Sequence, residues 1–254
     1  MSQPSFWRPL GRLGHPREMI RHFTPNWFTT TMGTGVLALV VAALPLSLPG
    51  QEQVAEALWG LAVGLFGVST LIYAARWLLF FDGARQIFTH PVVSMFLGCI
   101  PMGLATNLNG LLRIGPDHWG EDTVVAVALP LWCLDAGLAL ACGLLVPFLM
   151  FTRQSHAIEQ MTAVWLLPVV AAEVAAVSGG TLAPHLVEPS AQLAVLIASY
   201  VLWACSVPLA LSVLGILLLR LVVYKLPPAS MAASSWLALG PIATGALGLM
   251  VLGE

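Results

Sequence analysis

Two carboxylic acids lie deep inside apolar runs of the sequence, where ionisable side chains are rare. Asp135 belongs to the run 123–151, and Glu173 belongs to the run 161–177. Each acid lies about twelve residues into its run, or about 18 Å along a helix axis. A charged carboxylate near the centre of a bilayer is costly, so it normally faces a cavity or a polar partner. Each acid is therefore either a proton site on a transport path or a neutral, hydrogen-bonded structural group.

Small and weakly polar residues recur at helical spacing in three other apolar runs, 26–48, 91–112 and 235–254. Small residues allow two helices to approach closely, so one interpretation is tight helix packing. The other interpretation is the wall of a pore, because polar groups inside a membrane must face protein or water. Three such faces on alternate helices favour a shared lumen. The residues that we expect along this path are Thr31, Thr34, Gly35, Gly103, Thr106, Asn107, Glu173, Gly240 and Thr244.

No recognisable catalytic or metal-binding motif accompanies these residues. The six histidines lie between the apolar runs or near their ends, and none has metal-ligand spacing such as HExxH. The four cysteines lie inside apolar runs without CxxC spacing, which is typical of small core residues. We therefore expect no enzyme, cofactor or metal site. The lack of a basic cluster speaks against a nucleic-acid partner.

The composition indicates a membrane protein. The 254-residue chain is 58% hydrophobic and 9% charged, and its mean hydropathy is +0.88. Soluble domains contain about 25% charged residues. About 20 apolar residues cross a bilayer core as a helix. We predict an all-α polytopic membrane protein with seven spans, at about 26–48, 54–81, 91–112, 123–151, 161–177, 191–223 and 235–254. The fifth span is expected to end at the breaker Ser178-Gly179-Gly180.

The basic residues predict which side of the membrane faces the cytoplasm. With the N-terminus inside, every lysine and arginine except Arg113 falls on the inner side of the seven spans. This asymmetry follows the positive-inside rule and predicts a cytoplasmic N-terminus. Residues 1–24 then form a basic cytoplasmic segment, in which 16–23 are either a short interfacial helix or a plain tether. Residues 25–254 form one transmembrane domain.

The spans repeat as helical hairpins. Spans 1, 3, 5 and 7 begin about every 70 residues, and we expect helix kinks in them at Gly33, Pro101, Pro168 and Pro241. The hairpins are 25–81, 91–151 and 161–223, followed by a half hairpin at 235–254. This pattern predicts a ring in which kinked odd-numbered helices surround a lumen and plain helices lie outside. In such a ring Glu173 lies on an inner helix, so a role in permeation or proton coupling is favoured for it. Asp135 lies on an outer helix, so a structural role is favoured there.

Several segments, in their order and spacing, resemble the tellurite-resistance/dicarboxylate transporter family. They are Trp27-Phe28 with Met32-Gly33-Thr34-Gly35, His90-Pro91 with Pro101-Met102, Trp165-Leu166-Leu167-Pro168 with Ser178-Gly179-Gly180, and Pro227-Pro228 with Leu239-Gly240-Pro241. The family includes the bacterial channel TehA, a yeast malate permease, fungal sulfite exporters and the plant slow anion channels. The resemblance implies ten helices, arranged as five hairpins in a quasi-fivefold ring. It also implies a homotrimer in the cell inner membrane.

The resemblance implies a function and shows one departure. It implies transport of a small anion, such as malate, sulfite, nitrate, chloride or a tellurite-linked species, by a channel or a carrier. No lysine or arginine lies deep in a span, so selectivity would depend on helix ends, hydroxyls, amides and pore width. Seven spans make three and a half hairpins, so the chain looks truncated at its C-terminal side. The family's gating phenylalanine, on the ninth helix, has no counterpart here.

Two other functions are compatible with the residues. One is a non-transporting structural or sensory membrane protein. The other, which is less favoured, is an intramembrane enzyme. Such an enzyme would need a nucleophile–base pair or metal ligands inside the membrane.

Overall fold

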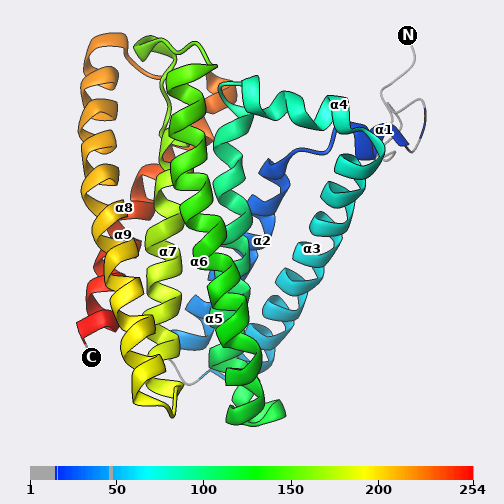
Figure 1. Ribbon diagram of the computed structural model, residues 1–254, viewed down its shortest axis with the longest axis vertical. Coiled ribbons are helices and arrows are strands. Elements are labelled where there is room, and N and C mark those ends of the chain that lie inside the picture. Colours follow the sequence, from blue (N-terminus) through cyan, green and yellow to red (C-terminus); the bar gives the residue numbers. More distant parts are fainter. Residues whose placement is uncertain (1–14, 16, 46–47, 254) are drawn as a thin grey trace.

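Seven helices long and apolar enough to span a membrane dominate the structure. The computed structural model describes residues 15, 17–45 and 48–253, and all regular secondary structure within these ranges is helical. The predicted all-α class and the seven spans are therefore confirmed. The seven spans in Figure 1 contain α2 (Phe28–Ala43), α3 (Gln51–Leu79), α5 (Cys99–Trp119), α6 (Glu121–Thr152), α7 (Leu167–Leu182), α8 (Pro189–Tyr224) and α9 (Leu239–Gly253).

Two short helices, α1 (Arg17–Arg21) and α4 (Phe81–Ala84), lie at one end of the bundle (Figure 1). Helix α1 falls within the segment 16–23 for which the sequence left a short helix or a tether open. The basic residues Arg8 and Arg12 of the N-terminal segment lie outside the described residues.

Short 3-10 helices precede the four odd-numbered spans of the sequence. They are η1 (Pro25–Trp27), η3 (Val93–Gly98), η5 (Ala163–Leu166) and η7 (Ala229–Ala238). The α-helix that follows η3, η5 or η7 carries a proline in its first turn, where the backbone N–H has no partner within the helix in any case.

This placement changes the role of the prolines for which kinks were expected. Pro101, Pro168 and Pro241 lie in the first turns of α5, α7 and α9, so they mark the change from 3-10 to α-helix. Gly33 lies inside α2, which is assigned as continuous from Phe28 to Ala43. The even-numbered spans, which were expected to be plain, contain the internal prolines Pro130, Pro147 and Pro208.

The predicted breaker Ser178-Gly179-Gly180 does not end the fifth span, because α7 continues to Leu182. Packing explains the glycines. A Cβ atom at Gly179 would lie 2.8 Å from the indole nitrogen of Trp132 on α6, and closer still to the hydroxyl of Ser199 on α8. The glycine therefore allows three helices to approach closely, rather than ending one of them.

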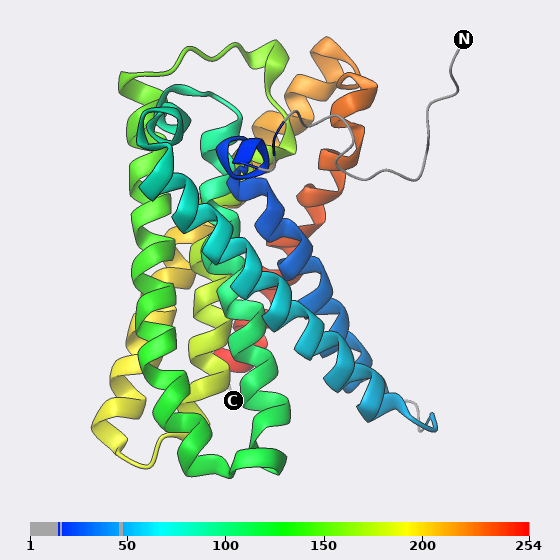
Figure 2. The ribbon, with the colours of Figure 1, turned by 90° about the vertical axis from the view of Figure 1, so that its right-hand side faces the viewer.

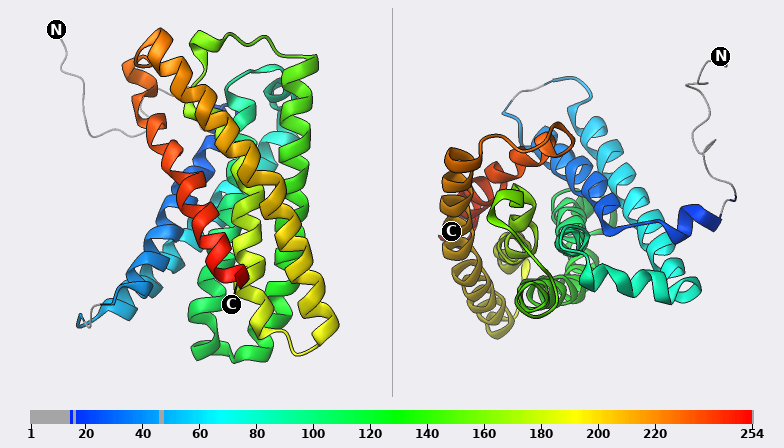
Figure 3. Two further views of the ribbon diagram at one scale, coloured as in Figure 1. Left: turned by 90° about the vertical axis from the view of Figure 1, so that its left-hand side faces the viewer. Right: turned by 90° about the horizontal axis from the view of Figure 1, so that it is seen from above.

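Helix α7 is the centre of the bundle. All of its residues except Val174 and Thr181 are buried. Seen from above, it lies between α8 and the pair α5–α6 (Figure 3). Helices α2 and α3 pack side by side and slope away from the other helices toward the end opposite α1 (Figure 2).

Helices α2 and α9, expected to lie inside a ring, each bury only one face. The buried residues of α2 are Phe28, Thr31, Gly35 and Ala38, and those of α9 are Pro241, Gly245, Gly248 and Leu252. Both sets recur at helical spacing, so each helix has one packed face and one broad apolar face that meets the cavity described below or the surroundings.

The three hairpins are closed at the α1 end by one repeated arrangement. A polar side chain close to the end of the second helix donates a hydrogen bond to a backbone carbonyl in the segment that precedes the first helix. Arg76 donates to the carbonyl of Phe23 with an N···O distance of 2.5 Å, and Gln154 donates to that of Phe88 at 3.1 Å. Arg220 donates to the carbonyl of Glu159 at 3.1 and 2.6 Å. We call these three residues the hairpin clamps.

Candidate functional site

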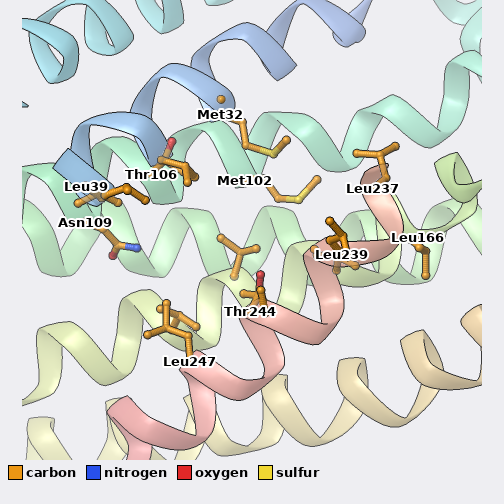
Figure 4. Close-up of a pocket in the computed structure, with 18 of the residues that line it drawn as sticks. Met32, Leu39, Met102, Thr106, Asn109, Leu166, Leu237, Leu239, Thr244 and Leu247 are labelled. Atoms are coloured by element: carbon orange, nitrogen blue, oxygen red, sulfur yellow. The ribbon is translucent and has the colours of Figure 1, made fainter. Parts of the chain in front are cut away.

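A cavity of about 650 Å³ lies between α2, α5, α7 and α9, with the last residues of η5 and η7 at one side (Figure 4). Its wall is largely aliphatic. The wall residues are Met32, Gly33, Val36, Leu39, Val40, Ala43, Met102, Thr106, Asn109, Leu166, Leu167, Val170, Val174, Val177, Trp236, Leu237, Leu239, Gly240, Ala243, Thr244 and Leu247.

The cavity contains little polar chemistry. None of the described residues that line it is charged, and their only hydroxyl or amide side chains are those of Thr106, Asn109 and Thr244. Thr106 donates its hydroxyl hydrogen to the carbonyl of Gly103 within α5, at 3.0 Å. A largely aliphatic space with a few polar groups is typical of small-molecule sites, and this one could admit a small solute without holding it by charge.

The structure brings part of the expected path together. Of the residues named from the sequence, Thr106, Gly240 and Thr244 line the cavity, and Gly33 does so as well. The others do not line it.

The small stripe of α2 packs against α5. A Cβ atom at Gly35 would lie 2.6 Å from the Thr106 hydroxyl oxygen, so the glycine allows the two helices to touch. Thr31 is fully buried, and Thr34 donates to the carbonyl of Thr30 at 2.8 Å. The larger apolar residues of α2 face the cavity instead, because small residues are needed where two backbones approach.

Gly103 and Asn107 of α5 face α3 rather than the cavity. A Cβ atom at Gly103 would lie 3.4 Å from the ring of Phe66. The indole nitrogen of Trp59 donates to the backbone carbonyl of Asn107 at 3.0 Å. This face of α5 therefore serves the packing of the first hairpin.

Glu173 is fully buried and lies against α8, not on the cavity wall. Its Oε2 atom is 3.4 Å from the hydroxyl of Ser206, and that hydroxyl donates to the carbonyl of Val169 at 2.7 Å. The cavity face of α7 consists of Leu167, Val170, Val174 and Val177. This geometry matches the structural alternative for Glu173, an acid turned toward a hydroxyl partner.

Asp135 is fully buried on α6, and neither of its carboxyl oxygens has a hydrogen-bond partner among the described residues. It does not line the cavity. Its helix packs against α5 and α7, so it belongs to the packed layer behind the wall.

Sequence reasoning missed Asn109 and the apolar wall of α2. Met102, Thr106 and Asn109 lie at positions i, i+4 and i+7, which share one face of a helix. Extending the face from Thr106 along this spacing would have selected Asn109 instead of Asn107. For α2, polarity was the misleading signal, because its polar stripe is the packed face.

Comparisons with known proteins identify a family and several relatives. The sequence profile described as voltage-dependent anion channel matches residues 22–254. The sulfite efflux pump of Arthroderma benhamiae is 39% identical over 234 residues, which cover 92% of this chain and 62% of the pump. An uncharacterized transporter of Methanocaldococcus jannaschii is 31% identical, with 92% and 65% covered. The malic acid transport protein of Schizosaccharomyces pombe is 23% identical, with 69% and 40% covered. The chain thus spans about three fifths of the length of the first of these relatives.

Proposed function

The chain belongs to the voltage-dependent anion channel family, and from this premise we propose that it transports small anions through the cavity between α2, α5, α7 and α9. The family predicted from the sequence motifs is therefore confirmed. The observation that carries the proposal is a cavity between membrane-spanning helices whose described lining has no charge. Such a lining allows an anion to enter without trapping it, which conduction requires.

The substrate class that we propose is a small oxyanion, either sulfite or a short carboxylate such as malate. Two of the similar proteins bear names that refer to these solutes. A cavity of about 650 Å³ has room for either. Family membership in a group of transport proteins speaks against the intramembrane enzyme considered from the sequence.

Flux through liposomes tests this proposal. The complete translation product of the gene, reconstituted in lipid vesicles, should move sulfite or malate along its gradient faster than empty vesicles do. A sulfite- or malate-dependent signal equal to that of empty vesicles would contradict the proposal. It would favour the structural or sensory alternative.

We also propose that the α1 end of the bundle faces the cytoplasm of a cell inner membrane, with residues 1–24 as a cytoplasmic segment and 25–254 as one transmembrane domain. The α1 end carries the described basic residues other than Arg113, which lies in the last turns of α5 at the opposite end. A homotrimer is the assembly that we propose from the family resemblance.

Cysteine labelling of intact cells tests the orientation. A cysteine introduced at Glu52, exposed at the start of α3, should react with a membrane-impermeant maleimide added outside. A cysteine introduced at Ser155, exposed after α6, should react only after the membrane is opened. Protein without an introduced cysteine is the control, and the reverse pattern would invert the topology.

Glu173 is proposed to support the cavity wall from behind, by holding α7 against α8. Glu173→Gln keeps the shape and can still bond to Ser206, so we expect the stability to change by less than about 1 kcal/mol. Glu173→Ala removes the contact and leaves a void, and we expect a loss of about 2 kcal/mol. Thermal unfolding in detergent measures both. Loss of the pH dependence of flux in the Gln variant would instead show that the acid is a proton site.

A further inference from the structure

Asn109 is the one amide side chain among the described residues of the cavity wall. Its nitrogen points into the cavity, toward the side where Thr244 lies (Figure 4). Its Oδ1 atom is enclosed by protein and has no hydrogen-bond partner among the described residues. The amide therefore presents N–H donors to the cavity, while its acceptor faces the protein.

Thr244 supplies a second free donor from another helix. Its hydroxyl points into the cavity from α9 and has no hydrogen-bond partner among the described residues (Figure 4). Among the hydroxyl and amide side chains of the wall, Thr106 differs, because it already gives its hydrogen to the carbonyl of Gly103. The hydroxyl and amide donors that remain available to a solute in the cavity are thus those of Asn109 and Thr244.

We propose that Asn109 and Thr244 form the anion-contacting site of the cavity. This inference rests on the proposed transport function and assigns its specificity. An anion that enters an aliphatic cavity loses water, and hydrogen bonds to a charged group recover more free energy than bonds between neutral groups. Donors on two helices fit an oxyanion, whose several oxygen atoms can accept both bonds at once. A site without a fixed positive charge binds weakly, which suits release on the other side.

A purely structural role makes the opposite prediction for stability. An amide in an aliphatic wall, with its oxygen unpaired, costs free energy compared with an aliphatic side chain of similar size. Asn109→Leu should therefore fold at least as stably as the unmodified protein. A residue kept for packing would lose stability when replaced, whereas a residue kept for the solute loses transport.

The test uses the complete translation product in liposomes, with sulfite as the probe. Asn109→Leu and Thr244→Val should each raise the half-saturating sulfite concentration about tenfold, with the melting temperature unchanged or higher. Asn107→Leu and Thr34→Val are the matched controls, because they remove the same groups from α5 and α2 outside the cavity. The controls should leave the half-saturating concentration unchanged. Equal effects in the test and control variants would overturn the site.

A binding measurement separates this proposal from the transport function. In detergent, sulfite at the ionic strength of a chloride reference should raise the melting temperature of the unmodified protein more than that of Asn109→Leu. A larger sulfite-induced rise in the unmodified protein, without sulfite flux in liposomes, would uphold the site and contradict the transport function. Flux with the same sulfite response in both proteins would uphold transport and overturn the site.

Discussion

Gly98→Ala is expected to lower the stability more than any other single methyl addition discussed here, by about 3 kcal/mol or more. Gly98 ends η3 where it packs against the start of α7. A Cβ atom there would lie 2.7 Å from the carbonyl carbon of Leu167 and 3.0 Å from the Cα of Pro168, and the Leu167 oxygen would be closer still. All three are backbone atoms, so no side-chain rotation can relieve the clash. Membrane yield and thermal unfolding in detergent measure the loss.

Gly60→Ala is the matched control for this prediction. Gly60 lies in α3, and a Cβ atom there would meet nothing within 4 Å. Alanine is favoured over glycine in a helix by about 1 kcal/mol, so this variant should be equally or more stable. A similar loss in both variants would show that η3 and α7 do not pack as closely as described.

Arg220→Met is expected to cost about 3 kcal/mol of stability, which makes it the second large effect. Arg220 is 4% exposed, and its guanidinium donates twice to the carbonyl of Glu159 and once, at 2.6 Å, to that of Lys225. Methionine fills similar space but leaves both carbonyls without these donors. Thermal unfolding and protease sensitivity of the segment after α6 should both report the change.

Two variants show whether the bonds of Arg220 or its charge matter. Arg220→Lys keeps the charge but lacks the forked donors, so it should fall between the unmodified protein and Arg220→Met. Arg85→Met removes an exposed arginine paired with Asp82 at 3.2 Å, and it should change the stability by less than about 1 kcal/mol. If Arg220→Lys matches the unmodified protein, charge rather than bond geometry holds this end.

The sequence predicted the helices well because the bilayer limits the choices. Only a helix or a closed barrel can satisfy the backbone in lipid, so long apolar runs become helices of known minimum length. This reasoning fails at Gly179. In soluble proteins a glycine often marks the end of a helix, whereas here it lies inside a helix where neighbouring helices pack closely. The bounds of α7 could be found only from its neighbours Trp132 and Ser199.

The candidate site was only partly predictable, because it depends on which residues lie opposite each helix face. Thr31, Gly35 and Thr106 have similar sequence signals, yet of the three only Thr106 lines the cavity, while Thr31 is fully buried and Gly35 lies against Thr106. Periodicity identifies a face of a helix but does not say whether protein or open space lies opposite. Thr244 and Asn109 face the same cavity from different helices, and that relation exists only in the assembled structure.

The hairpin clamps have a consequence for how the protein is made. Arg76, Gln154 and Arg220 each donate to a carbonyl that precedes the first helix of their own hairpin. A ribosome delivers the chain from the N-terminus, and each pair of helices is complete or nearly complete when its clamp residue emerges. The clamp can then form before the next pair has been synthesised. The clamp side chain and the carbonyl that it bonds are therefore paired without any contribution from later helices. Assembly can proceed pair by pair, and damage to one clamp should delay insertion from that pair onward while leaving earlier pairs in place.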